Sequence, residues 1–232
     1  MRLPSSRTVS LFSLFFPRTC PMCGRYAGEK GGPVCEQCLR TLPRTEQAQL
    51  RQNSTEMALE SALRLDRAAA FLFFEKEHPI QRLMHAMKYG EQPQIGYQLG
   101  RQAAMEFQYA GFFDGIDLII PIPLHPKRER ERGYNQSEFI ARGISEVTGI
   151  EVDTSHVTRV KDTPKQALQT EEGRRLNMAN AFAANHPEQV YGKHILVVDD
   201  VITTGETMLS CLKAMRRFRG ATYSVLALCK AK

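Results

Sequence analysis

Tryptophan is absent from the 232-residue sequence, and aromatic residues make up only 8% of it. Proteins that hold single-stranded nucleic acid mainly by stacking rely on aromatic side chains, so this composition gives that mode of binding little support. No apolar run approaches the ~20 residues that a membrane-spanning helix needs. We therefore expect a protein that does not span a membrane.

A secretory signal is also not evident. Residues 9–16 are apolar and follow Arg2 and Arg7, but this run is short, has no small-residue cleavage site and continues into Pro17 and a cysteine motif. We expect a short helix that covers the cysteine module, with a signal peptide as the alternative. The expected location is the cytoplasm.

Four cysteines are arranged as two Cys-x-x-Cys pairs, Cys20 with Cys23 and Cys35 with Cys38. This spacing predicts a zinc site of four thiolates. Two disulfides are the alternative, but a cytoplasmic protein keeps its thiols reduced. Four sulfur ligands leave no open coordination position, so the zinc is expected to be structural. The remaining cysteines, Cys211 and Cys229, fall on apolar positions and are expected to be buried thiols.

Basic residues outnumber acidic ones by 31 to 25, which gives a formal charge of +6. The excess is clustered at residues 127–132, 159–165, 174–175 and 213–219. The last cluster has the spacing of a helix face and indicates a solvated surface. The first three fall in predicted loops, where a role in binding a polyanion is the favoured interpretation.

Residues 195–207 carry the strongest functional signal in the chain. A β-branched apolar run ends in Asp199 and Asp200, and the turn Thr203-Thr204-Gly205-Glu206-Thr207 leads into a predicted helix. Backbone N–H groups and hydroxyls of such a turn can surround a phosphate, while the two carboxylates can accept hydrogen bonds from vicinal ribose hydroxyls. The pattern predicts a ribose 5-phosphate site, with an ordinary capped helix after a strand as the alternative.

Strands and helices alternate over the second part of the chain. Apolar residues recur at helical spacing in residues 80–88, 95–107 and 135–148, and extended apolar runs precede or follow them. This alternation predicts an α/β fold with a doubly wound parallel sheet and its site at the carboxyl ends of the strands. We divide the chain into a zinc module with an apolar helix at residues 1–40, a linker at 41–62 and the α/β domain at 63–232.

The turn at residues 203–207 resembles the motif that binds phosphoribosyl pyrophosphate (PRPP) in type I phosphoribosyltransferases. Together with the cysteine pairs, the chain is similar to the ComF family, in which a four-cysteine zinc module precedes a domain of that type. The segments that carry this resemblance are Met87-Lys88-Tyr89, Ile120-Pro121-Ile122-Pro123, Arg132-Gly133-Tyr134-Asn135-Gln136, Gln166 and Arg174-Arg175-Leu176-Asn177.

The resemblance implies a type I phosphoribosyltransferase fold and a set of site residues. PRPP, carried with Mg²⁺, would be bound by Asp199, Asp200, Thr203, Thr204, Gly205, Glu206, Thr207 and Lys127. If transfer occurs, Asp199, Asp200, Arg128 and Arg132 are the candidate catalytic residues, since cationic side chains can stabilise the leaving pyrophosphate. Candidates for contact with nucleic acid are Lys127, Arg128, Arg132, Tyr134, Asn135, Arg159, Lys161, Arg174 and Arg175.

Three functions remain open at this stage. The favoured one is a PRPP-binding protein that acts in DNA uptake during natural transformation and handles single-stranded DNA. The second is an enzyme that transfers phosphoribose from PRPP to an unidentified acceptor. The third is a docking protein whose zinc module recruits a ComF-type helicase without catalysis. No acceptor pocket is recognisable in the sequence.

Overall fold

The computed structural model describes residues 19–28, 32–62, 64–75, 77–162 and 180–231. The expected helix at residues 9–16 and the motif residues Gln166, Arg174 and Arg175 lie outside these ranges. Within them, no helix is long and apolar enough to cross a bilayer.

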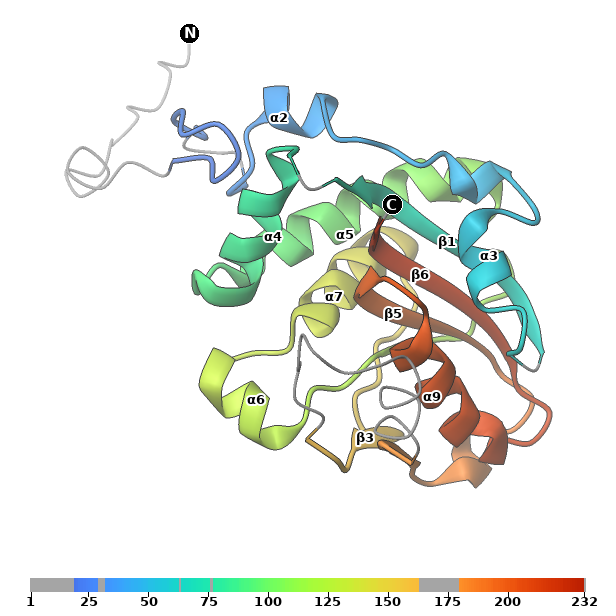
Figure 1. Ribbon diagram of the computed structural model, residues 1–232. Helices are drawn as coiled ribbons and strands as arrows, with labels where there is room; N and C mark the ends of the chain where they lie inside the picture. Colours follow the sequence, from blue (N-terminus) through green and yellow to red (C-terminus); the bar gives the residue numbers. More distant parts are fainter. Residues whose placement is uncertain (1–18, 29–31, 63, 76, 163–179, 232) are drawn as a thin grey trace, which may run out of the picture.

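A four-stranded parallel sheet with the order β1-β6-β5-β2 forms the centre of the molecule (Figure 1). Its strands are β1 (Leu65–Phe74), β2 (Leu118–Pro121), β5 (His194–Ile202) and β6 (Thr222–Ala231). The inner strands β5 and β6 read as nearly continuous apolar runs, as expected for strands that are covered on both faces. A small antiparallel pair, β3 (Val157–Arg159) with β4 (Phe182–Ala184), lies beside the sheet.

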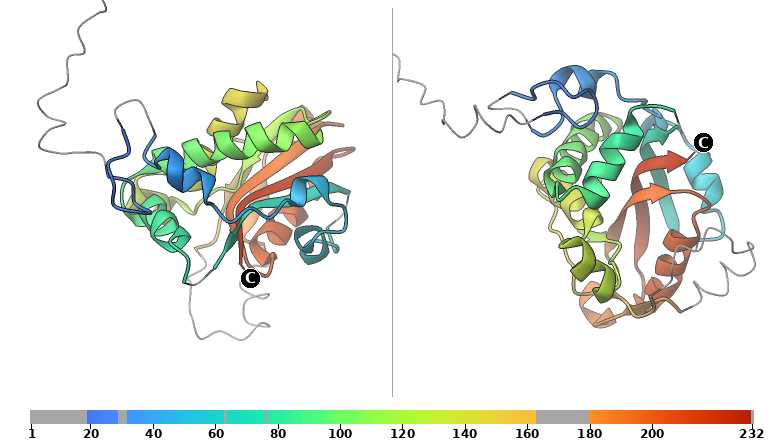
Figure 2. Two further views of the ribbon diagram at one scale, coloured as in Figure 1. Left: turned by 90° about the horizontal axis from the view of Figure 1, so that it is seen from above. Right: turned by 60° about the vertical axis from the view of Figure 1, so that its left-hand side comes forward.

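Helices cover both faces of the sheet, as the two views in Figure 2 show. One layer holds α4 (Ile80–Tyr89), α5 (Pro93–Phe107) and α7 (Gln136–Thr148), and the other holds α9 (Glu206–Ala214). The predicted doubly wound α/β fold is confirmed. The remaining helical segments are α2 (Glu36–Arg40), α3 (Ser54–Ala58), α6 (Pro126–Arg132) and the 3-10 turns η1 (Gln47–Gln49), η2 (Gln108–Ala110), η3 (Pro187–Val190) and η4 (Met215–Arg217).

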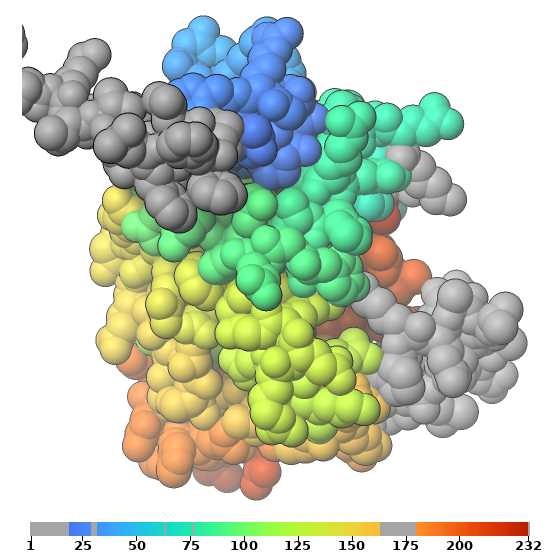
Figure 3. All heavy atoms as spheres, turned by 90° about the vertical axis from the view of Figure 1, so that its left-hand side faces the viewer, coloured from blue at the N-terminus to red at the C-terminus, as the bar shows by residue number. Residues whose placement is uncertain are grey.

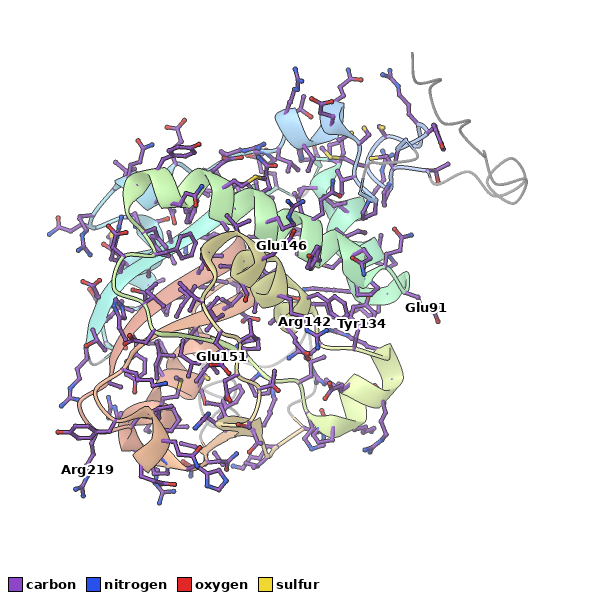
Figure 4. The ribbon with its side chains drawn as sticks, turned by 180° about the vertical axis from the view of Figure 1, so that it is seen from behind. Glu91, Tyr134, Arg142, Glu146, Glu151 and Arg219 are labelled. Atoms are coloured by element: carbon purple, nitrogen blue, oxygen red, sulfur yellow. The ribbon has the colours of Figure 1, made fainter. Side chains whose placement is uncertain are left out.

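Helices α5 and α7 pack unusually closely because glycine stands where they cross. A Cβ on Gly143 would lie 2.1 Å from the carbonyl oxygen of Tyr97, and one on Gly100 would lie 2.2 Å from that of Ile140. Only glycine permits this backbone approach. Across the same contact Arg101 Nε lies 2.9 Å from Glu146 Oε2, and Figure 4 shows Glu146 on α7 at this side of the molecule.

Residues 41–58 cover the outer edge of β1. The amide of Ala70 donates to Gln47 Oε1 at 3.0 Å, and Asn53 Nδ2 donates to the carbonyl oxygen of Ala68 at 2.8 Å. An exposed strand edge is a template for unwanted pairing, and these side chains occupy it. The segment expected to be a linker thus holds short helices in contact with the sheet, while the division of the chain at residues 40 and 62 stays a prediction.

The cysteine module packs against the helical layer and belongs to the same apolar core. Cys20, Met22, Val34 and Leu42 are buried in one cluster with residues of α4 and α5. Gln98 on α5 joins the two parts, because its Oε1 accepts from the amide of Val34 and its Nε2 donates to the carbonyl oxygen of Val34, both at 2.9 Å. One side chain therefore satisfies both backbone groups of a module residue.

We predict that Gln98→Ala lowers the free energy of unfolding by about 1–3 kcal/mol, because the backbone groups of Val34 lose their partner in a half-buried setting. Urea unfolding of the full chain measures this change. Gln94→Ala, on an exposed position of the same helix, is the matched control and is expected to change stability by less than about 0.5 kcal/mol. Equal stabilities of the two variants would contradict the role given to Gln98.

Candidate functional site

Asp199 and Asp200 lie in the last part of β5, beyond the end of its neighbour β2. The sequence predicts that the strand ends at Val198, but β5 continues to Ile202 because residues 199–202 keep pairing with β6. The two carboxylates have different partners. Asp199 is buried and Oδ1 accepts from Ser137 Oγ at 3.1 Å, whereas Asp200 Oδ2 lies 2.9 Å from Lys88 Nζ.

Burial raises the pKa of Asp199 to about 7, and the charge of Asp200 raises it as well. The amide of Asp200, the hydroxyl of Ser137 and the charge of Lys88 act in the opposite direction. The pair therefore concentrates negative charge in a place where water solvates it poorly. Hydroxyl donors from a ligand would satisfy oxygens that the protein leaves partly unsolvated.

The turn at residues 203–207 follows β5 directly and starts α9. Thr203 and Thr204 are exposed, and Glu206 and Thr207 lie in the first turn of the helix. Gly205 is the N-cap with φ +84°, a conformation that favours glycine. A Cβ there would lie 3.1 Å from both the carbonyl oxygen of Ala58 and the Leu59 side chain. Packing against α3 thus also requires glycine, so Gly205→Val is a poor probe of ligand binding.

The basic residues after β2 lie on a helix, and the expectation of a loop is wrong. Helix α6 begins at Pro126, with His125 Nδ1 accepting from the amide of Lys127 at 3.3 Å, and ends at Arg132, which Gly133 follows with φ +80°. Lys127 is exposed, whereas Arg128 Nε lies 3.0 Å from Asp162 Oδ1. A proline at the start of a segment and a glycine just past its end both indicate a helix. The sequence analysis gave more weight to the run of charged residues between them and predicted a loop.

Arg132, Tyr134 and Asn135 connect α6 to the helical layer. Arg132 NH1 donates to Gln136 Oε1 at 2.7 Å, and its guanidinium lies 5.3 Å from the ring centroid of Tyr89. The Tyr134 hydroxyl donates to the carbonyl oxygen of Met87 at 2.5 Å, and Figure 4 labels Tyr134 next to α7. Asn135 is buried, donates to the carbonyl oxygen of Ile122 and caps α7. Tyr134 and Asn135 therefore hold the local fold and offer little free surface.

The second basic cluster, at residues 159–165, is only partly described. Arg159 lies on β3, not in a loop, with its guanidinium 5.3 Å from the ring centroid of Phe182. Burial lowers the pKa of Arg159, as does the charge of Arg128, whereas Asp199 and Asp162 act oppositely. This cation thus lies within electrostatic reach of Asp199. Lys161 is exposed, and Arg174 and Arg175 lie outside the described residues.

Lys88, on α4, is the site residue that the sequence reading did not assign. Its ammonium and the Asp200 carboxylate are both largely buried, with side-chain exposures of 14% and 16%. Lys88 and Asp200 are far apart in the chain, so no spacing in the sequence predicts their contact. The only signal was the segment Met87-Lys88-Tyr89, which carried the family resemblance but had no assigned chemistry.

The four predicted metal ligands form one cluster. The sulfur atoms of Cys20, Cys23, Cys35 and Cys38 all lie within 4.8 Å of one another, and the Cys23 and Cys35 sulfurs are 3.8 Å apart. Zinc bound at about 2.3 Å by four sulfurs in a tetrahedron has sulfur–sulfur edges of about 3.8 Å. Burial acts to raise the pKa of Cys20, but backbone hydrogen bonds, that of Cys35 foremost, lower it to about 7. The residues fit a closed, structural zinc site.

Comparisons with known proteins identify both parts of the chain. Residues 131–231 match the phosphoribosyl transferase domain family, and residues 11–49 match the double zinc ribbon domain family. The chain is 33% identical to the DNA utilization protein YhgH of Escherichia coli O157:H7 over 155 residues, which cover 66% of this chain and 67% of that protein. It is 32% identical to Competence protein F of Haemophilus influenzae, over 66% of this chain and 69% of that protein.

Among solved structures, the chain is similar to a glutamine PRPP amidotransferase from B. subtilis complexed with ADP and GMP. That similarity has a TM-score of 0.40 and 18% identity, and it covers 61% of this chain and 30% of the other.

Zinc analysis tests the cysteine cluster. We predict about one zinc per chain, and its loss in Cys20→Ser and in Cys35→Ser, since three thiolates bind the metal less tightly than four. Cys211→Ala removes a thiol on α9 and should keep the zinc. Iron in place of zinc, or a metal-free protein after reducing purification, would contradict the assignment.

The buried carboxyl of Asp199 should make stability depend on pH. Its pKa is raised in the folded protein, so the folded state holds the proton more tightly between pH 3.8 and about 7, and stability is lost as pH rises through that window. Asp199→Asn removes the charge, and we predict a variant more stable than the parent at pH 7.5 by a few kcal/mol, as each pKa unit is worth about 1.4 kcal/mol.

The gap should close as the pH falls toward 4, and urea unfolding across this range measures it. Glu60→Gln makes the same chemical change at an exposed position and is the control. A stability difference that does not vary with pH would argue against a perturbed carboxyl at Asp199.

Proposed function

The chain belongs to the ComF family, and we propose that it binds PRPP with Mg²⁺ at the carboxyl end of β5 and handles single-stranded DNA during DNA uptake. The chain has a type I phosphoribosyltransferase fold joined to a zinc ribbon module. Its sheet, its cysteine cluster and both family matches support this assignment. DNA uptake is proposed because its relatives are named for DNA utilization and competence. A cytoplasmic location is part of the proposal.

One observation carries the PRPP proposal: the acidic pair is followed within the same strand end by a turn that opens a helix. Asp199 and Asp200 can accept from two adjacent ribose hydroxyls, while the backbone and hydroxyls at residues 203–207 can bind the 5-phosphate at the start of α9. Both groups belong to one sugar phosphate, and the turn fixes their separation. An isolated capped helix would not need the preceding buried carboxyl of Asp199, whose charged form destabilises the fold.

Cationic side chains support binding of the pyrophosphate end. Lys127 and Arg128 on α6 and Arg159 on β3 converge on the region of Asp162, where Arg128 already binds a carboxylate. A guanidinium that pairs with a carboxylate can pair with a phosphate in the same geometry. Mg²⁺ would lower the charge of the pyrophosphate that these residues receive.

The basic surface of α6 supports the DNA part of the proposal. Lys127 and Arg130 are exposed on this helix. Phosphate contacts of this kind supply most of the affinity for a single strand without reading its sequence. The helix is therefore the proposed path of the DNA backbone.

Phosphoribosyl transfer is the second candidate function. Arg159 near Asp199, and Arg128 and Arg132 on α6, favour it because they could stabilise negative charge as pyrophosphate leaves. Consumption of PRPP and release of pyrophosphate in the presence of an acceptor would separate an enzyme from a protein that only binds PRPP. Docking of a ComF-type helicase by the zinc module stays a prediction.

Calorimetry with PRPP and Mg²⁺ tests the sugar-phosphate site. We predict that Thr204→Val weakens binding about 10- to 100-fold, since a hydrogen bond to a charged group contributes about 1.5–3 kcal/mol. Asp200→Asn should weaken it as well, by removing the acceptor charge opposite the ribose. Thr154→Val, an equal change at another exposed threonine, should bind PRPP as the parent does. A parent protein that binds no PRPP would overturn the proposal.

Salt dependence tests the DNA path. We predict that Lys127→Glu with Arg130→Glu weakens binding of a single-stranded oligonucleotide and makes the slope of log affinity against log salt shallower by about 1.4, at about 0.7 per phosphate contact. Arg216→Glu with Arg217→Glu gives the same charge change on the exposed turn η4 and should keep the parent slope. If both double variants change the slope equally, the effect comes from net charge alone, and α6 is not the path of the DNA.

A further inference from the structure

Tyr89, the last residue of α4, is the exposed aromatic side chain next to the proposed site. Its side chain is 59% exposed. Tyr134, in contrast, uses its hydroxyl to bind Met87 and packs its ring edge-to-face on Phe139 at 5.6 Å. Tyr134, a candidate from the sequence for contact with nucleic acid, therefore offers a poorer stacking surface than Tyr89.

Two neighbours hold the Tyr89 ring in place. The guanidinium of Arg132 lies over the ring at 5.3 Å from its centroid, and Gln136 binds that guanidinium at 2.7 Å. The ring of His85 is 5.0 Å from that of Tyr89 and tilted by 45°. We call these three residues, His85, Tyr89 and Arg132, the Tyr89 platform. Because its members come from α4 and α6, the platform presents a fixed aromatic surface and does not depend on a flexible loop.

The platform borders the proposed sugar-phosphate site on one side and the basic helix on the other. Lys88, the preceding residue, binds Asp200 at 2.9 Å, and the exposed Lys127 and Arg130 lie on the same helix as Arg132. Figure 3 shows α4 (teal) and α6 (yellow-green) meeting on one face of the molecule. A strand whose phosphates follow α6 would thus bring its bases toward Tyr89.

The chemistry of the platform suits a planar, electron-rich ring. Tyrosine and arginine planes both stack on nucleobases, and such stacking contributes about 1–3 kcal/mol per base without selecting the sequence. An apolar protein segment would be a poor occupant, because the charged guanidinium of Arg132 lies over the ring and would lose hydration. An exposed tyrosine alone would mean little; the guanidinium over its ring and the adjacent cations distinguish this one.

We propose that the Tyr89 platform stacks on a nucleobase, either a base of the single-stranded DNA or the free base that would accept phosphoribose. The proposal rests on the proposed function and names a part of the site that neither the acidic pair nor the phosphate turn supplies. It accounts for how a protein without tryptophan and with few aromatic residues holds a base.

The test compares a twelve-residue oligothymidine with an abasic strand of the same length, which has the phosphates but no bases. Tyr89→Leu should weaken binding of oligothymidine about 5- to 100-fold, as the stacking free energy implies, and leave the abasic strand unaffected. Tyr89→Phe keeps an aromatic ring and should retain the parent affinity. Tyr109→Leu, at an 87% exposed tyrosine on η2, should match the parent with both strands.

Each outcome either supports or overturns the proposal. If Tyr89→Leu weakens both strands equally, or if Tyr89→Phe is as weak as Tyr89→Leu, no base stacks there. If the parent binds neither strand, DNA handling fails, and free uracil, adenine and guanine are titrated in the presence of PRPP and Mg²⁺. A free base that binds the parent and binds Tyr89→Leu more weakly then supports the acceptor alternative. If no free base behaves in this way, the inference is overturned. Calorimetry of PRPP alone with the parent reports separately on the sugar-phosphate site.

Discussion

The site depends on a difference in length between two neighbouring strands. Strand β2 ends at Pro121, opposite Val198, while β5 continues to Ile202 beside β6. The backbone bond at this end of the pair runs from the amide of Ile122 to the carbonyl oxygen of Val198, at 2.8 Å. Beyond this point one side of β5 is free for the start of α7, which is how Ser137 reaches Asp199. Asn135 fixes that approach, as its side chain binds Ile122 and caps α7.

This arrangement places the carboxyl of Asp199 where its charged form destabilises the fold. Asp199 is buried beside Asp200, and only hydrogen bonds and the cation of Lys88 offset the cost of desolvating them. A sheet built for stability alone would carry apolar residues here, as β5 does over the residues before Asp199. Perturbed groups of this kind cluster at functional sites. The electrostatic cost is therefore concentrated at the strand end where we propose that the ligand binds.

The sequence was informative where one local pattern decides the structure. The apolar run before Asp199 predicted a buried parallel strand, and the cysteine spacing predicted the thiol cluster, because each depends on a short segment. The end of β5 was missed because polar residues there keep pairing with β6, which no local pattern reveals. Helix α6 was missed for a different reason. Its run of charged residues indicated a solvated loop, although the proline and glycine at its two ends indicate a helix. Contacts between distant segments, such as Lys88 with Asp200, could not be predicted from spacing.

The zinc module supports the layer of helices that carries the site. The module is too small to bury much apolar surface alone, and such small units depend on metal or on a partner surface. Here the four cysteines fit a zinc site, and helix α5 supplies the partner surface, because Gln98 binds Val34 within one shared core. Helix α5 in turn packs closely on α7 through Gly100 and Gly143. Since Ser137 lies in the first turn of α7, a continuous series of packed contacts extends from the cysteine cluster to Asp199.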